Sequence, residues 1–221
     1  MTSRNIWQTI RQLADSAIAT QSQRFFKTGE GEYGEGDQFL GIRVPVLREQ
    51  AKNFQDTPLK EVQKLLESPF HEERLCALLI LVRKFAQGNP DEQTRIYTLY
   101  LNNTQHINNW DLVDLSAYHI VGPYLEDKDR RPLHHLAQSD SLWERRIAII
   151  STFHFIRKNQ FDDAFAIAKQ LLNDPEDLIH KAVGWMLREI GKRDLATEEA
   201  FLKDHYQQMP RTMLRYAIEK F

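Results

Sequence analysis

The sequence contains one cysteine and has almost no excess of charge of either sign. A single thiol among 221 residues, Cys76, excludes an internal disulfide and is typical of a protein of the reducing cytoplasm. Because Cys76 stands in an apolar run, we expect a small buried core residue rather than a nucleophile. The formal net charge is -2, so positive charge that binds a nucleic acid would have to be gathered on one face.

Long apolar runs are also missing, and none approaches the roughly 18 residues that a membrane-spanning helix needs. Residues 1–16 lack the apolar core of a secretion signal. Hydrophobic residues make up 42% of the chain and charged residues 27%, as in soluble globular proteins. These features predict a cytoplasmic protein that has no contact with a membrane.

The common motifs of phosphate and metal chemistry are absent: there is no GK[ST] loop, no HExxH and no Cys/His cluster. Residues 29–34 read GEGEYG and fit the GxGxxG pattern of dinucleotide-binding loops. However, no strand precedes them, no helix follows directly, and the adjoining acidic residues would repel a pyrophosphate. We interpret the segment as a flexible loop and predict neither a metal nor a cofactor.

Helical periodicity dominates what is present, and strand-like alternation is nearly absent. Near the N-terminus the apolar positions fall on one predicted helical face, made of Ile6, Ile10, Leu13, Ala14 and Ala17. Farther along, helix pairs are separated by turn signals, and corresponding segments recur about every 32 to 40 residues. We therefore predict an all-α fold, a single HEAT-like repeat domain (1–221) forming a solenoid. Its concave side would carry a row of charges: Arg74, Asp114, Arg146 and Lys181.

The predicted helix 109–124 carries a carboxylate within its apolar stripe. Asp114 follows Trp110 by four residues, so both lie on one helical face. A buried carboxylate costs several kcal/mol unless it is paired or faces a site. Two interpretations remain open: a structural ion pair with an arginine of the next repeat, or a catalytic carboxylate beside an aromatic platform.

The predicted helix 142–157 repeats this anomaly with the opposite charge. Arg146 lies within its apolar stripe, whereas Arg145 points elsewhere. A guanidinium in such a stripe needs an anion. This anion could be Asp114 of the adjacent repeat or a phosphate of a ligand, and both hold if the pair borders a cleft.

On the predicted helix 178–191, Trp185 falls outside the apolar core face and is expected to be exposed. It shares its own face with three cations: Lys181, Arg188 and Lys192. One interpretation is a tryptophan packed under a neighbouring element with solvated cations around it. The other is an aromatic contact within a track that binds phosphates.

Four segments together resemble the AlkD-like alkylpurine DNA glycosylases, a family of HEAT-like repeat DNA alkylation repair proteins. They are DQFLGIRVP (37–45), WDLVD (110–114), LWERR (142–146) and KAVGWMLRE (181–189), and they span nearly the whole chain in order. The resemblance implies a concave face that binds double-stranded DNA. It also implies excision of cationic alkylated purines, such as N7-methylguanine and N3-methyladenine, without base flipping.

The resemblance assigns roles to particular residues. Asp114 corresponds to the catalytic aspartate, and Trp110 and Trp185 to tryptophans that contact the deoxyribose of the lesion. Arg146 corresponds to an arginine that supports the DNA backbone. We expect the remaining DNA-binding residues to be Arg145, Lys181, Arg188 and Lys192. A further aromatic near the N-terminus is either Phe25 or Phe26.

The expected reaction needs only one catalytic carboxylate. An alkylated purine is already a cationic leaving group, so no general acid is required, and Asp114 would stabilise the oxocarbenium-like sugar and orient the water. No metal or cofactor is expected, and a monomer is the expected state. The alternatives are a HEAT-like scaffold that catalyses nothing and a DNA-binding paralogue without turnover.

Overall fold

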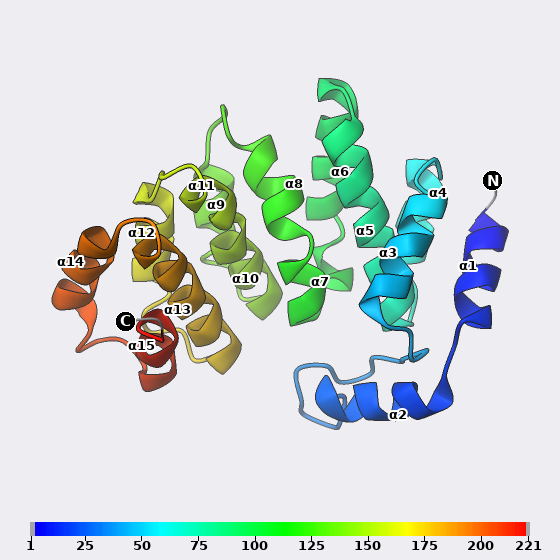
Figure 1. The fold of residues 1–221 in the computed structure, drawn as a ribbon, viewed down its shortest axis with the longest axis horizontal. Coiled ribbons are helices and arrows are strands. Elements are labelled where there is room, and N and C mark those ends of the chain that lie inside the picture. The colour runs from blue at the N-terminus through cyan, green and yellow to red at the C-terminus, as the bar shows by residue number, and fades with distance from the viewer. Residues whose placement is uncertain (1–2, 220–221) are drawn as a thin grey trace. The chain divides into compact units, whose positions relative to one another are not determined.

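A computed structural model describes residues 3–219 of the chain, with side chains from Ile6 onward. Within these residues all regular structure is helical, and the only strand-like contact is an isolated parallel bridge between Gln38 and Phe70 (Figure 1). The all-α prediction is therefore confirmed. The chain divides into two compact units, with the boundary between Ser116 and Ala117. The solenoid and the single repeat domain stay predictions.

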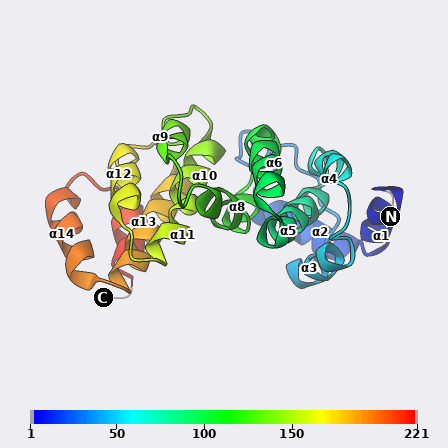
Figure 2. The ribbon, with the colours of Figure 1, turned by 90° about the horizontal axis from the view of Figure 1, so that it is seen from above.

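The first unit is built around a long central helix, α5 (His71–Gln87). Its residues 71–81 are all buried, since α3, α4 and α6 pack against it. Figures 1 and 2 both show α5 beside α3 and α6. The other helices of this unit are α1 (Ser3–Gln12), α2 (Ser16–Phe25), α3 (Val44–Asn53), α4 (Leu59–Leu66), α6 (Pro90–Leu101), the 3₁₀ helix η1 (Thr104–His106) and α7 (Trp110–Asp114).

The second unit is built around α13 (Asp177–Gly191), which packs against α10, α11, α12, α14 and α15. Gly184 lets α15 approach closely, because a Cβ there would lie 2.4 Å from the Met213 carbonyl oxygen. The other helices are α8 (Ala117–Tyr124), α9 (Arg131–Leu136), α10 (Leu142–Ser151), α11 (Phe153–Ile156), α12 (Asp162–Gln170), α14 (Leu195–His205) and α15 (Arg211–Ala217).

Two helices predicted as continuous are broken. Residues 109–124 form α7 and α8, separated at 115–116, where the Ser116 hydroxyl donates to the Leu112 carbonyl at 2.5 Å. Residues 142–157 form α10 and α11, separated at Thr152, whose hydroxyl donates to the Ile149 carbonyl at 2.6 Å. Such local side-chain bonds compete with the helical pattern. The apolar period continues across both breaks, and therefore it did not reveal them.

The predicted apolar face near the N-terminus is correct only for its first two residues. Ile6 and Ile10 are buried in α1, but that helix ends at Gln12, and Leu13 and the two alanines after it are exposed. Asp15 begins a separate helix, because its carboxylate accepts the backbone N–H groups of Ala17 and Ile18.

No helix between residues 3 and 219 has the length and apolarity needed to cross a membrane. In the same part of the chain, no group of three His, Cys, Asp or Glu side chains is placed to hold a metal ion. Cys76 is buried as predicted, and burial raises the pKa of its thiol to about 12.

The close approach at Gly184 gives the first prediction. Gly184→Ala should lower the free energy of unfolding by about 1 to 3 kcal/mol, because the added methyl group overpacks the contact between α13 and α15. Urea denaturation measures this change. Helix propensity alone predicts the opposite sign, about 1 kcal/mol of stabilisation, so a variant more stable than the parent protein would contradict the close approach.

Candidate functional site

The short helix α7 carries the two residues singled out in the first unit. Its start is capped by Asn109, whose side-chain oxygen accepts the backbone N–H of Trp110 at 2.9 Å. Asp111 and the two residues after it are buried, whereas Trp110 and Asp114 are half-buried. The predicted i, i+4 placement is thus realised, and both side chains lie on the face of α7 that turns away from the core.

Trp110 belongs to an aromatic cluster formed by Phe25, Phe26, Phe39, His71 and Trp110. Its ring stacks on Phe26, with ring centroids 5.3 Å apart, and meets the edge of Phe25 at 5.9 Å. Phe26 in turn stacks on Phe39 at 5.1 Å and lies 4.9 Å from the ring of His71. Phe25 is 63% exposed, so the cluster opens to solvent on its side. Both phenylalanines considered in the sequence therefore contact Trp110.

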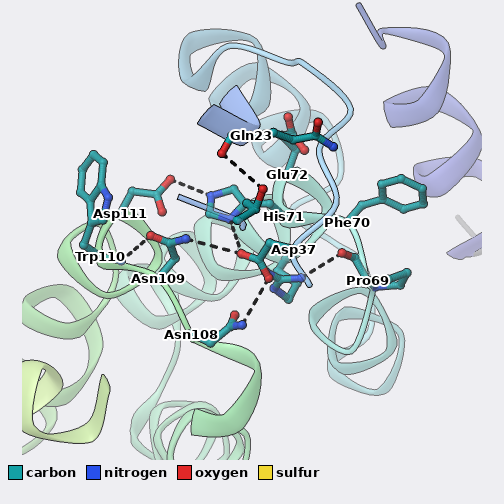
Figure 3. Close-up of polar contacts among 12 residues, drawn as sticks. Gln23, Asp37, Pro69, Phe70, His71, Glu72, Asn108, Asn109, Trp110 and Asp111 are labelled. Carbon is teal, nitrogen blue, oxygen red and sulfur yellow. Dashed lines mark hydrogen bonds and ion pairs between the residues drawn. The ribbon is translucent and has the colours of Figure 1, made fainter. Parts of the chain in front are cut away.

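A buried charge network of four side chains, Asp37, His71, Arg74 and Asp111, shares His71 with the aromatic cluster. Figure 3 shows His71 between Asp37 and Asp111. His71 Nε2 is 2.8 Å from Asp111 Oδ2, and His71 Nδ1 is 3.4 Å from Asp37 Oδ2. Arg74 Nη2 donates to Asp37 Oδ1 at 2.7 Å. Two cationic groups and two carboxylates thus balance one another out of water, as buried charges require.

The network sets the protonation state of His71. Burial alone would lower its pKa, but the charge and hydrogen bond of Asp111, together with the hydrogen bond of Asp37, raise the pKa to about 9. Burial would likewise raise the pKa of Asp37, and the contacts with His71 and Arg74 hold it below its usual value instead. At neutral pH, His71 is therefore an imidazolium that donates from both ring nitrogens.

Two asparagines connect this network to the start of α7. Asn108 Nδ2 donates to Asp37 Oδ1 at 3.3 Å, and Asn109 Nδ2 donates to Asp37 Oδ2 at 3.5 Å. Asp37 ends the Gly/Glu-rich loop that received no role in the sequence analysis. The two asparagines directly precede the WDLVD segment, and this position is the sequence feature that could have identified them as part of the site.

Two members of the row of charges predicted along the repeats are buried. Arg74 is 4% exposed and is paired with Asp37, and Arg146 is 5% exposed. Arg146 Nη1 donates at 2.5 Å to the carbonyl of Leu178, at the start of α13. Helical spacing gives the direction of a side chain, but it does not reveal which segment covers it. The choice between Asp114 and a phosphate as the anion of Arg146 stays a prediction.

Arg145 lies in contacts within the protein. Its Nε is 2.6 Å from Asp174 Oδ2, and its Nη1 donates at 2.9 Å to the carbonyls of Ser139 and Asp140. These bonds join the turns that precede α10 and α13. A DNA contact through this guanidinium stays a prediction.

Trp185 is half-buried, so the prediction of an exposed tryptophan is wrong. Its ring centroid is 5.9 Å from that of Phe153, which meets the ring of Tyr118 at 5.2 Å. Phe153 lies in the short helix α11, after the break at Thr152. Burial would raise the pKa of the Glu189 carboxyl, but its bonds with Lys192 and Arg193, and a weaker contribution from a hydrogen bond that Trp185 donates, lower it.

The three cations around Trp185 each have a carboxylate partner. Lys181 Nζ is 2.7 Å from Asp177, Lys192 Nζ is 2.5 Å from Glu189, and Arg188 pairs with Glu219. These acidic partners lie one helical turn away or on the chain after α15. The sequence pattern revealed the three cations but not their acidic partners, so the charge of this surface is more balanced than predicted.

The helices and the site together define a class: an all-helical protein with aromatic rings and a carboxylate on the outward face of a short helix. A family model described as DNA alkylation repair enzyme matches residues 6–221, so the chain belongs to the DNA alkylation repair enzyme family. This confirms the family resemblance inferred from the four segments.

A solved structure supports the fold. It is described as a predicted DNA alkylation repair enzyme from Enterococcus faecalis and is similar with a TM-score of 0.71 at 16% sequence identity. The match covers 94% of this chain and 96% of that chain. At this identity the likeness concerns the fold alone. No curated protein sequence matches the chain.

The raised pKa of His71 gives a prediction about stability. A group whose pKa is raised on folding stabilises the fold fully below its unfolded pKa, about 6.5 for histidine, and this contribution is lost as the pH rises through the folded pKa. For His71 that value is about 9. The free energy of unfolding should therefore fall between pH 6.5 and 9, by about 3 kcal/mol at most.

Urea denaturation across this range, on the parent protein and on His71→Gln, measures the effect. The difference in stability between the two should be largest near pH 6 and should shrink toward pH 9. Other groups that titrate in both proteins cancel in this difference. A difference that stays constant with pH would show that His71 is not held as an imidazolium.

Proposed function

We propose that the chain is an alkylpurine DNA N-glycosylase that releases cationic alkylated purines, N7-methylguanine and N3-methyladenine, from double-stranded DNA without flipping the base. The observation that carries the proposal is the pair Trp110 and Asp114, one turn apart on the outward face of α7 beside the open side of the aromatic cluster. Membership of the DNA alkylation repair enzyme family supports the choice of substrate class.

The chemistry fits a single carboxylate. When the C1′–N9 bond breaks, its electron pair neutralises the cationic purine, so the base leaves without being protonated. Positive charge develops on the sugar, and the carboxylate of Asp114 stabilises it electrostatically. Water then adds to C1′ and gives up a proton, which Asp114 can accept. The face of Trp110 adds a cation–π attraction to the same sugar. No step needs a metal or a cofactor.

The second unit would contribute contacts to DNA through Trp185 and the basic residues Arg145, Arg146, Lys181, Arg188 and Lys192. Because Lys181, Arg188 and Lys192 have carboxylate partners, phosphates would have to replace those partners on binding. The counterion release from each such contact is then partly offset. Such contacts determine the register of the protein on the duplex and do not read the base sequence.

The test of the reaction is base release from a duplex with one N7-methylguanine under single-turnover conditions. Asp114→Asn should lower the rate by about 100-fold or more, because the neutral amide no longer stabilises the sugar cation. Duplex affinity should stay within a few-fold of the parent protein. Asp91→Asn, an exposed carboxylate on α6, is the matched control and should release base at the parental rate.

Other outcomes separate the alternatives. Equal release by the parent protein and Asp114→Asn would remove Asp114 from the mechanism. Tight duplex binding without release by the parent protein would favour a DNA-binding paralogue, and the absence of both binding and release would favour a protein scaffold.

The proposed phosphate contacts predict a change in salt dependence. Lys181→Ala should weaken duplex binding and reduce the slope of log K against log[salt] by about one or less. Lys203→Ala, an exposed lysine of α14, should leave the slope unchanged. Fluorescence anisotropy between low and moderate salt measures both. An unchanged slope for Lys181→Ala would assign that lysine to the intramolecular pair with Asp177 alone.

A further inference from the structure

The first turn of α5 has an unusual composition for a buried segment, since all four residues 71–74 are ionisable and all are buried. Successive residues of a helix point about 100° apart, so four of them face four directions. Their partners come from α1, α7 and the loop between α2 and α3. Glu72 accepts the backbone N–H groups of residues 40–42, Glu73 pairs with Arg11 at 2.7 Å, Arg74 binds Asp37, and His71 binds Asp111 of α7.

We propose that His71 is a positioning residue for base release: its imidazolium holds Asp111, and with it α7, so that Trp110 and Asp114 keep a fixed direction toward DNA. This inference rests on the proposed function. His71 itself is 2% exposed and does not touch a ligand, so its effect on the reaction passes through α7.

The length of α7 explains why it needs such an anchor. With five residues, Trp110–Asp114, the helix is too short to be stable by its own hydrogen bonds. Asp111 stands between the two outward residues and points into the protein, where it meets His71 Nε2 at 2.8 Å. The other oxygen, Asp111 Oδ1, is buried and has no hydrogen-bond partner among the described residues. The contact with His71 therefore compensates most of the buried charge of Asp111.

His71 is also linked to Trp110 indirectly, through the ring of Phe26. The imidazole ring lies 4.7 Å from Phe39 and 4.9 Å from Phe26, and Phe26 stacks on Trp110 at 5.3 Å. The His71 side chain thus supports α7 through Asp111 and supports the Trp110 ring through Phe26. A change at His71 alters both supports together, which makes it a sharper probe than either phenylalanine.

The groups that face the imidazole decide when this support is present. They are Asp111 from α7, Asp37 from the loop before α3, and Arg74 from α5 itself; Phe26 and Phe39 are neutral. Two carboxylates against one guanidinium keep the imidazole charged through neutral pH. With a pKa of about 9, the support should weaken at alkaline pH.

The test compares His71→Gln with Glu73→Gln, a matched variant from the same turn that loses its ion pair with Arg11 of α1. Single-turnover release of N7-methylguanine is measured per folded molecule from pH 6 to 9.5, with spontaneous release subtracted. His71→Gln should be slower at pH 7 by on the order of 10- to 100-fold, a cost expected of small misplacements. Duplex affinity should change by less than about threefold, which is under 1 kcal/mol.

The pH profile separates positioning from a general loss of stability. The parent protein and Glu73→Gln should both lose activity with a midpoint near pH 9, whereas His71→Gln should lack this alkaline limb. Equal rates for His71→Gln and the parent protein would overturn the proposal. Equal losses in His71→Gln and Glu73→Gln would also overturn it, because the effect would then belong to the stability of the turn.

A second readout does not depend on catalysis. The emission of Trp110, taken as the difference between the protein and Trp110→Phe, should shift with a midpoint near pH 9 and should not shift in the His71→Gln background. If the parent protein releases no base, the proposed function fails while this signal still reports on α7. A flat Trp110 signal in the parent protein would overturn the positioning role in either case.

Discussion

The first unit depends on the pairing of charges at the start of α5. Four ionisable side chains are withdrawn from water within one helical turn, and a buried charge that loses its partner costs several kcal/mol. Each partner is therefore required, and the partners come from α1, from two places in the loop that follows α2, and from α7. This turn therefore holds in place segments that are 30 to 62 residues away in the sequence.

The same arrangement separates two electrical environments across α7. On its inner side, the charge network balances two cations with two carboxylates and adds little net field. On its outer side stand Trp110 and Asp114, with the aromatic cluster beside them. A carboxylate that stabilises a developing cation is most effective when its position is fixed before the reaction begins. In the proposed reaction, a dry, neutral support of this kind would provide that fixation without competing for the cation.

In the second unit, the basic residues and their acidic neighbours form pairs on the surface of α13. A chain with a net charge of -2 can bind a polyanion if phosphates take the place of such carboxylates. Exchange of this kind gives weaker attraction at long range than a free basic patch, and it leaves more of the specificity to close contacts. Trp185 donates to Glu189 and packs near Phe153, so its ring has a defined orientation within its own unit.

The sequence by itself determined the all-helical class, the family, the burial of Cys76 and the shared face of Trp110 and Asp114, because these follow from local period and from motif spacing. The tertiary structure alone decided what covers each helix. Arg74 and Arg146 are buried, Trp185 is half-buried, and His71 meets both Asp37, from an unassigned loop, and Asp111. These partners are 34 and 40 residues from His71, and helical periodicity carries no information over such separations. The breaks at Ser116 and Thr152 were missed for a related reason: one hydroxyl bond ends a helix without disturbing its apolar pattern.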